Sequence, residues 1–427
     1  MIIRATPLAY ALTTVMGCAL FLGILTGRAE LFVVALPLAI ALLSGAWRQQ
    51  APRFAVRQTV SVDRLSEGQQ VTVSVALLAE RPIPVVETLV ALPPLLALAA
   101  GGGNNRTVLT AAARREAGWS FAIVCPARGR FDIGTVLVRA WDLSGLSVIE
   151  ERRVLPRSLL VYPDVPAIRH LPKPVRTQRS FGNYVSPLLG EGIEPDEVRP
   201  FVAGDRTRRI NWRASLRRRQ LYVTQFQEER NADIILLLDA LTDIGVRPYS
   251  TLDSCVRATA ALAKGYLARK DRVGFVEFGA FLRWIDPATG RRQAEVLMEG
   301  LLPSATHFSY VVPRLDRLPR RILPRDSLVI AVTPLLDERF VGAVNDLVAR
   351  EFDVVVLAIS PVEAVRRVLT HSFADEIACR LWAAEWRSRG DALRLRGIAV
   401  CEWDADQPLE AALASFTATR RHSAARA

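Results

Sequence analysis

The chain has 427 residues, of which half are apolar and 23% are charged. This composition excludes an intrinsically disordered protein. The length is too great for one compact core, so two or three domains are expected at roughly 150 residues each. The net charge of +12 suits anionic partners such as lipid headgroups, nucleic acid or acidic protein surfaces, without choosing among them.

Two apolar segments predict a transmembrane helical hairpin over residues 1–50. From Ala5 to Gly27 no residue is charged, and a helix of this length crosses about 30 Å of hydrocarbon. A second uncharged run, Leu31–Trp47, lies near the lower length limit of roughly 17 residues. The sequence therefore predicts two transmembrane helices.

Arginines flank the two spans. Arg4 precedes the first span and three arginines in residues 48–57 follow the second, whereas the turn between the spans carries Arg28 balanced by Glu30. The positive-inside rule therefore predicts a two-pass protein of the cell membrane whose soluble domains face the cytoplasm. A cleaved signal peptide is the alternative, because a positive charge before an apolar run is also typical of one. No good A-x-A cleavage site follows, and the second run would still be an anchor.

Residues 51–165 are predicted to form a small all-β domain of sandwich type. Three segments, Val71–Leu77, Trp119–Val124 and Thr135–Ala140, alternate apolar and polar residues with the period of half-buried strands. Consecutive Gly and Asn residues at 101–105 predict a turn. No cluster of His, Cys or carboxylates accompanies these strands, so the expected role of this domain is spacing or docking.

A linker and an arginine-rich segment follow, over residues 166–230. From residue 198 onward the chain reads V-R-P-F-V-A-G-D-R-T-R-R-I-N-W-R-A-S-L-R-R-R-Q-L-Y-V-T-Q-F-Q-E-E-R. Guanidinium groups pair bidentately with carboxylate or phosphate, so this segment is a candidate for binding an anion or a partner. The candidate residues are Arg199, Gly204, Asp205, Arg208, Asn211, Trp212, Ser215, Arg217 and Glu229.

Three alternatives stay open for the arginine-rich segment. In a structural buttress, Asp205 and Glu229 would pair with nearby arginines while Trp212 and Phe226 pack inward. Nucleic-acid binding needs little more than arginines and an aromatic residue, although a membrane anchor disfavours it. The arginines could also contact anionic lipid at the inner leaflet.

Residues 231–416 predict an α/β domain. Ala232–Leu238 is a continuous apolar run that ends in Asp239, as is typical of a buried parallel strand. Helices and strands then alternate, which predicts a doubly wound sheet with its ligand site at the carboxyl ends of the strands. The last residues, 417–427, are predicted to be a frayed basic tail. The further predicted elements are the helix 252–268, the strand 272–278, the helix 291–300, the strand 328–332, the helix 338–350, the strand 354–359, the helix 374–389 and the strand 397–401.

The stretch V-R-P-F-V-A-G-D-R-T-R-R-I-N-W-R-A-S with the following L-Y-V-T-Q-F-Q-E-E resembles the signature of the bacterial domain of unknown function family 58. The upstream A-R-G-R-F-D-I-G-T-V-L-V-R-A-W-D-L-S-G-L resembles the β region of that family. Two positions depart mildly: Asn211 stands where Asp is usual, and Ser215 where Thr is common. The resemblance implies a von Willebrand A-like α/β domain and a MoxR-type AAA+ ATPase as partner, with no catalysis assigned.

The von Willebrand A resemblance implies a possible Mg²⁺ site, because such domains often hold this ion through a D-x-S-x-S loop. Here the loop reads D-A-L-T-D from Asp239 to Asp243, so Leu241 replaces the first hydroxyl residue and a carboxylate replaces the second. Thr306 and Thr333 lie in loops that would supply further ligands. The substitutions weaken this hypothesis, and the alternative is that Asp239 caps a helix or orders its loop.

Signals of familiar enzymes are absent from the sequence. It contains no G-x-S-x-G, no P-loop, no G-x-G-x-x-G and no H-E-x-x-H, and its four histidines are scattered. The five cysteines lack C-x-x-C spacing, which favours a reducing compartment over a disulfide framework or a zinc ribbon. The sequence therefore predicts no enzyme, no resident cofactor and no small-molecule substrate. It favours a membrane-anchored interaction scaffold that works with the AAA+ ATPase in assembly or maturation of other proteins.

Overall fold

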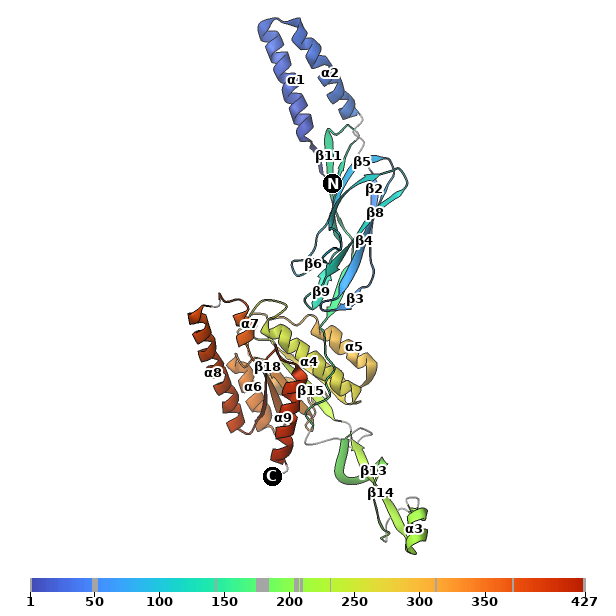
Figure 1. Ribbon diagram of the computed structural model, residues 1–427, viewed down its shortest axis with the longest axis vertical. Coiled ribbons are helices and arrows are strands. Elements are labelled where there is room, and N and C mark those ends of the chain that lie inside the picture. Colours follow the sequence, from blue (N-terminus) through green and yellow to red (C-terminus); the bar gives the residue numbers. More distant parts are fainter. Residues whose placement is uncertain are drawn as a thin grey trace. The chain divides into compact units, whose positions relative to one another are not determined.

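The chain divides into two compact units, residues 1–162 and 163–427 (Figure 1). The first carries two apolar helices and an all-β region, and the second carries an α/β domain. The predicted multidomain organisation, with all-β and α/β parts, is therefore confirmed. The computed structural model describes residues 2–47, 53–142, 144–173, 184–202, 207, 210–230, 232–311, 313–370 and 372–424.

Two apolar helices, α1 (Pro7–Thr26) and α2 (Ala29–Trp47), follow one another at the N-terminus. By length and composition, α1 is able to cross a membrane. In α2 the apolar stretch is Ala29–Ser44, which is shorter than a helix that crosses a membrane. The described residues thus contain one candidate span, and neither the second span nor the two-pass topology is established.

The residues before α1 belong to the β region rather than to the helices. The strand β1 (Ile2–Ala5) pairs antiparallel with β11 (Ser147–Val154). Thr6 follows directly, and its buried hydroxyl donates a hydrogen bond to the carbonyl oxygen of Gly145 at 2.7 Å. The same oxygen accepts from the N–H of Ala9 at 3.3 Å and so caps α1. These contacts join α1 to the β region without a free linker.

The β region is built from two main sheets around one apolar core. One sheet has the strand order β1-β11-β10-β5-β7 and the other β2-β4-β8-β6, with a small third sheet β3-β12-β9. Along β4 the inward positions are buried and alternate with more exposed ones, which is the period expected of a sandwich. The bounds are β2 Phe54–Val60, β3 Arg64–Ser66, β4 Gln70–Ala79, β5 Ile83–Val90, β6 Ala97–Leu98, β7 Arg106–Ala111, β8 Glu116–Val124, β9 Gly129–Asp132, β10 Thr135–Trp141 and β12 Ser158–Tyr162.

The second unit contains a six-stranded sheet of order β17-β16-β15-β18-β19-β20. All neighbouring strands are parallel except β16 and β17. Helices α4, α5 and α9 pack on one face, and α6 and α8 on the other. The bounds are β13 Tyr184–Pro200, α3 Trp212–Arg218, β14 Tyr222–Arg230, β15 Asp233–Asp239, α4 Thr251–Ala268, β16 Arg272–Phe278, β17 Leu282–Ala288, α5 Gly290–Leu301, β18 Leu328–Thr333, α6 Glu338–Ala349, β19 Asp353–Ile359, α7 Val362–Arg366, α8 Phe373–Leu395, β20 Ala399–Trp403 and α9 Leu409–Ala424.

Two elements of the α/β domain differ from the prediction. The antiparallel strand β17 was not predicted, because its sequence L-R-W-I-D-P-A alternates poorly and contains Pro287, which is tolerated at a sheet edge. Helix α9 extends through Ala424, so most of the predicted basic tail is helical. Leu409 and Leu413 of this helix are buried in the core, which explains why the helix forms there.

The Pro-rich segment after β12 is also different from the linker that the sequence predicts. Ile168 and Leu171 are buried in the same core as α4. The buried hydroxyl of Tyr266 on α4 donates to the carbonyl oxygen of Pro172 at 2.6 Å. These contacts fix the segment to the α/β domain.

Tyr266→Phe should loosen this segment. The variant removes one buried hydrogen bond and leaves the carbonyl of Pro172 without that donor, which costs about 1 kcal/mol of unfolding free energy. Limited proteolysis should then cut residues 163–172 faster than in the wild type. Tyr310→Phe, at an exposed tyrosine, is the matched control and should leave the cleavage rate unchanged. Equal rates in all three proteins would show that the hydrogen bond does not hold the segment.

Candidate functional site

The strand order of the α/β sheet reverses between β15 and β18, which is where ligands commonly bind in such sheets. Asp239 ends β15 and Thr333 ends β18, and both side chains are fully buried. The Thr333 hydroxyl donates to Oδ2 of Asp239 at 2.6 Å, and the N–H of Leu241 donates to Oδ1 at 3.1 Å. Both carboxylate oxygens therefore have partners within the domain.

Burial raises the pKa of Asp239 to about 7, although its hydrogen bonds with Thr333 and Leu241 act in the opposite direction. The nearby Asp337 raises this pKa further, and Arg339 lowers it. A carboxyl group of this pKa is partly protonated near neutral pH. Because metal ligation requires the deprotonated group, burial weakens Asp239 as a Mg²⁺ ligand.

The two remaining predicted metal ligands are Asp243 and Thr306. Asp243 accepts from the N–H of Leu252 at 2.9 Å and from the hydroxyl of Thr251 at 3.3 Å, so it binds the first turn of α4, whose N-cap is Ser250. Thr306 is exposed in the loop after α5. In the part of the chain that the structure describes, no group of three or more His, Cys, Asp or Glu residues could hold a metal ion. These donors do not fit a Mg²⁺ site in the geometry observed.

The loop after β18 is held by α8, a contact that the sequence did not reveal. The indole N–H of Trp386 donates to the carbonyl oxygen of Pro334 at 2.8 Å. Arg389, three residues further along α8, donates to the carbonyl oxygen of Leu335 at 3.1 Å. Leu335 has a φ of 56°, and its N–H donates to the Thr333 hydroxyl oxygen at 2.9 Å. The edge of the sheet at Asp239 is therefore a closed, internally bonded structure.

Within the arginine-rich signature, residues 211–222 form a compact turn that joins α3 to β14. The Asn211 side chain accepts from the N–H of Ala214 at 3.0 Å and caps α3, while its own N–H donates to the carbonyl oxygen of Tyr222 at 2.8 Å. The buried Ser215 hydroxyl accepts from the N–H of Tyr222 and donates to the carbonyl oxygen of Asn211, both at 2.8 Å. We call Asn211, Ser215 and Tyr222 the α3 clip. Both departures from the family pattern lie in it, and both keep polar side chains that bond within it.

The rest of α3 faces solvent. Trp212 is 64% exposed and Leu216 is 79% exposed, and their spacing of four residues places them side by side on the helix. Arg213 and Arg217 are exposed with the same spacing. The inward packing of Trp212 that the buttress alternative expects is therefore wrong. We call Trp212, Arg213, Leu216 and Arg217 the α3 face.

The remaining signature residues are placed as follows. Arg199 on β13 is half-buried and donates to the carbonyl oxygen of Pro200 at 3.1 Å. The backbone of Glu229 on β14 lies opposite Val185 of β13. The predicted residues Gly204, Asp205 and Arg208 lie outside the described residues.

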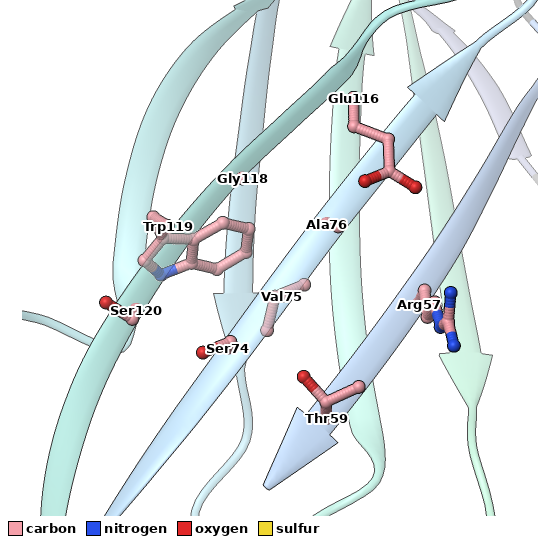
Figure 2. Close-up of a pocket in the computed structure, with 9 residues that line it drawn as sticks. All are labelled: Arg57, Thr59, Ser74, Val75, Ala76, Glu116, Gly118, Trp119 and Ser120. Carbon is pink, nitrogen blue, oxygen red and sulfur yellow. The ribbon is translucent and has the colours of Figure 1, made fainter. Parts of the chain in front are cut away.

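A shallow groove of about 430 Å³ lies on the β region, across strands β2, β4 and β8 (Figure 2). Its lining holds no histidine or cysteine, and Glu116 is its one carboxylate, so it offers no familiar pair of groups for nucleophilic or acid–base catalysis. The lining residues are Arg57, Thr59, Ser74, Val75, Ala76, Glu116, Gly118, Trp119 and Ser120.

The family model described as "Protein of unknown function DUF58" matches residues 197–365. This segment belongs to the DUF58 family. The match confirms the family resemblance over the α3 clip and much of the α/β domain. An uncharacterised protein of Mycobacterium tuberculosis and one of Mycobacterium bovis are each 28% identical over 120 residues. The match spans 27% of this chain and 38% of the length of these relatives.

Solved structures resemble this chain only distantly. A CARDB domain from Pyrococcus furiosus, solved in complex with di-metal ions, is 10% identical, with a TM-score of 0.17 and coverage of 26% of this chain and 93% of that one. A cupredoxin domain from Nitrosocaldus yellowstonii is 13% identical, with a TM-score of 0.19 and coverage of 27% and 90%. Scores this low carry no inference about the function of this chain.

Asp239→Asn should flatten the pH dependence of stability. The folded-state pKa of about 7 lies above the ordinary value of 3.8, so the folded protein binds this proton more tightly than the unfolded chain between these values. The contribution of Asp239 to the unfolding free energy therefore falls as the pH rises from about 4 to about 7, and is constant above. The Tm of the wild type minus the Tm of the variant should therefore decrease as the pH rises from about 4 to about 7. A difference that stays constant with pH for Asp239→Asn would contradict its raised pKa.

Ser215→Ala should open the α3 clip. It leaves the buried N–H of Tyr222 without its acceptor, which costs about 1–3 kcal/mol and speeds amide exchange at Tyr222 by roughly tenfold or more. Hydrogen exchange with mass spectrometry measures this directly. Ser215→Thr keeps the hydroxyl and should exchange at the wild-type rate, as should Leu216→Ala on the exposed side. Unchanged exchange in Ser215→Ala would mean that the clip is held in another way.

Proposed function

We propose that this protein is a membrane-anchored docking protein whose α3 face binds a partner protein. The observation that supports this most is the exposure of Trp212 and Leu216 beside two arginines on a helix fixed by the α3 clip. Aromatic residues and arginine dominate the binding energy of protein interfaces, and a contiguous apolar patch on a surface helix usually marks an interaction site.

The α3 clip favours binding because it orders the helix before the partner arrives. Asn211 and Ser215 satisfy the backbone groups that join α3 to Tyr222, so little further ordering of this turn is needed on docking. The arginines on the α3 face pair best with carboxylates. The partner surface is therefore expected to combine an apolar pocket for Trp212 with an acidic rim.

The family resemblance points to a MoxR-type AAA+ ATPase as this partner, with the pair working in assembly or maturation of other proteins. The same resemblance, together with a parallel sheet that has one antiparallel edge strand, supports a von Willebrand A-like assignment for the α/β domain. We further infer no catalytic role, because the carboxylate at the strand-order reversal, Asp239, is closed off by Thr333 and Leu241.

The anchor in this proposal is the helix α1, with α2 as a second span. Supporting features are the uncharged length of α1 and the arginines that follow α2, which favour a cytoplasmic side for both ends by the positive-inside rule. The direct junction of α1 with the β region through Thr6 would hold that region close to the membrane surface.

Trp212→Ala combined with Arg217→Glu should abolish capture of the partner. Tagged full-length protein is purified from its own membranes in mild detergent, and co-purifying proteins are identified by mass spectrometry. An AAA+ ATPase should co-purify with the wild type and with the control Arg291→Glu, which changes an exposed arginine on α5. It should be reduced at least about tenfold in the double variant, since loss of a central aromatic anchor costs about 2 kcal/mol or more.

Two other outcomes would overturn the proposal in favour of its rivals. Nucleic acid that co-purifies with the wild type and is lost steeply with added salt would assign the arginines to phosphate contacts. Binding of the soluble domains to anionic vesicles, lost in the double variant while no protein partner is captured, would assign them to lipid. Equal ATPase capture by wild type and double variant would move the interface away from the α3 face.

A further inference from the structure

Helix α8 carries an apolar stripe that faces away from the domain. Its inner side is buried against the sheet through Cys379, Trp386, Gly390 and Leu393. Residues advance by about 100° each around a helix, so Ile377 lies about 200° around α8 from Cys379, on the opposite side, and it is 42% exposed. Helix α8 therefore has apolar residues on its solvent side as well as on its buried side.

The exposed stripe has a regular spacing. Ala374, Ile377, Leu381, Ala384 and Ser388 recur at alternating intervals of three and four residues along the helix. Leu381 is 69% exposed, and the alanines and the serine are exposed as well. This is the spacing of a coiled-coil seam, in which the small residues let a second helix approach closely. We call these five residues the α8 seam.

The α8 seam has defined ends. The capping box of Ser372 and Asp375 starts the helix, with hydrogen bonds of 3.1 Å and 3.0 Å between each side chain and the other residue's N–H. Asp391 occupies the next seam position after Ser388, and a carboxylate there is unfavourable between two helices. The apolar contact surface is thus confined to about four turns of α8.

We propose that two copies of this chain associate through the α8 seam, with the two α8 helices parallel. The charges beside the seam select this arrangement. Arg380 and Arg387 lie along one flank and Glu385 lies on the other. In a parallel pair, Arg380 of each copy faces Glu385 of the other, whereas an antiparallel pair sets the arginine flanks against each other. A two-fold axis along the seam makes the surface self-complementary.

Arg380 and Glu385 each make an ion pair within one chain, and these pairs are weak enough to be replaced by pairs between the two copies. Arg380 donates to Glu376 at 3.1 Å, and Glu385 accepts from Arg389 at 2.9 Å. All four side chains are at least 40% exposed, and exposed pairs of this kind stabilise a helix only weakly. This association does not depend on the proposed partner of the α3 face, which lies on a different helix.

The mass of the full-length protein in detergent or nanodiscs tests the proposal. The wild type should be a dimer in equilibrium with monomer, and Leu381→Glu should weaken association by about tenfold or more, since a buried leucine contributes roughly that much. Val296→Glu is the control, because Val296 is an apolar residue 41% exposed on α5, away from α8, and it should dimerise like the wild type. A monomeric wild type, or a dimer that Leu381→Glu leaves intact, would overturn the proposal.

Two further variants test the direction of the helices. Ala384 faces its own counterpart across a parallel seam, so Ala384→Cys in a Cys18→Ser background should form a disulfide-linked dimer on mild oxidation. Ala349→Cys, at an exposed alanine of α6, should not. Arg380→Glu and Glu385→Arg should each weaken the dimer, and the double variant should restore it. Equal cross-linking at both cysteines, or no restoration in the double variant, would exclude the parallel pairing.

Discussion

The two-sided burial of β15 is the constraint on which the α/β domain depends. Every residue from Asp233 to Asp239 is buried, because helices cover both faces of the sheet and parallel neighbours flank the strand. A carboxylate that ends such a strand must find partners inside the protein, and Asp239 finds them in Thr333 and the N–H of Leu241. The position where this kind of sheet usually binds ligands is thereby occupied by the protein's own hydrogen bonds.

Because that edge is closed, the interactions proposed for this protein lie on its surface helices. The α3 face and the α8 seam share one design: the polar groups that fix the helix are satisfied internally, while apolar side chains on the other side are left exposed. The same helix α8 that presents the seam also holds the loop next to Asp239 through Trp386 and Arg389. A shift of α8 on association would therefore change the position of that loop, since these hydrogen bonds join the two.

The sequence predicts the parallel core well because burial on both faces leaves an unambiguous signal. The strand 272–278 is found at the predicted bounds, and β15 is displaced by one residue. Strand β17 escapes prediction because a polar edge strand lacks that signal, and the packing of the segment that holds Ile168 depends on distant residues of α4. The von Willebrand A resemblance named Asp239 and Thr333, with Asp243 and Thr306, as possible metal ligands. The direct hydrogen bond between Asp239 and Thr333, and the support from Trp386, depend on tertiary contacts that no local pattern encodes.

The central claim is that the α3 face is a docking surface for a protein. The most direct test replaces Trp212 with a photo-crosslinking amino acid in the full-length chain and irradiates it in its own membranes, with the same amino acid at Arg291 as control. The account predicts a cross-link from position 212, absent from position 291, to a single protein, identified by mass spectrometry as an AAA+ ATPase. Cross-links from position 212 to lipid or nucleic acid alone would contradict it.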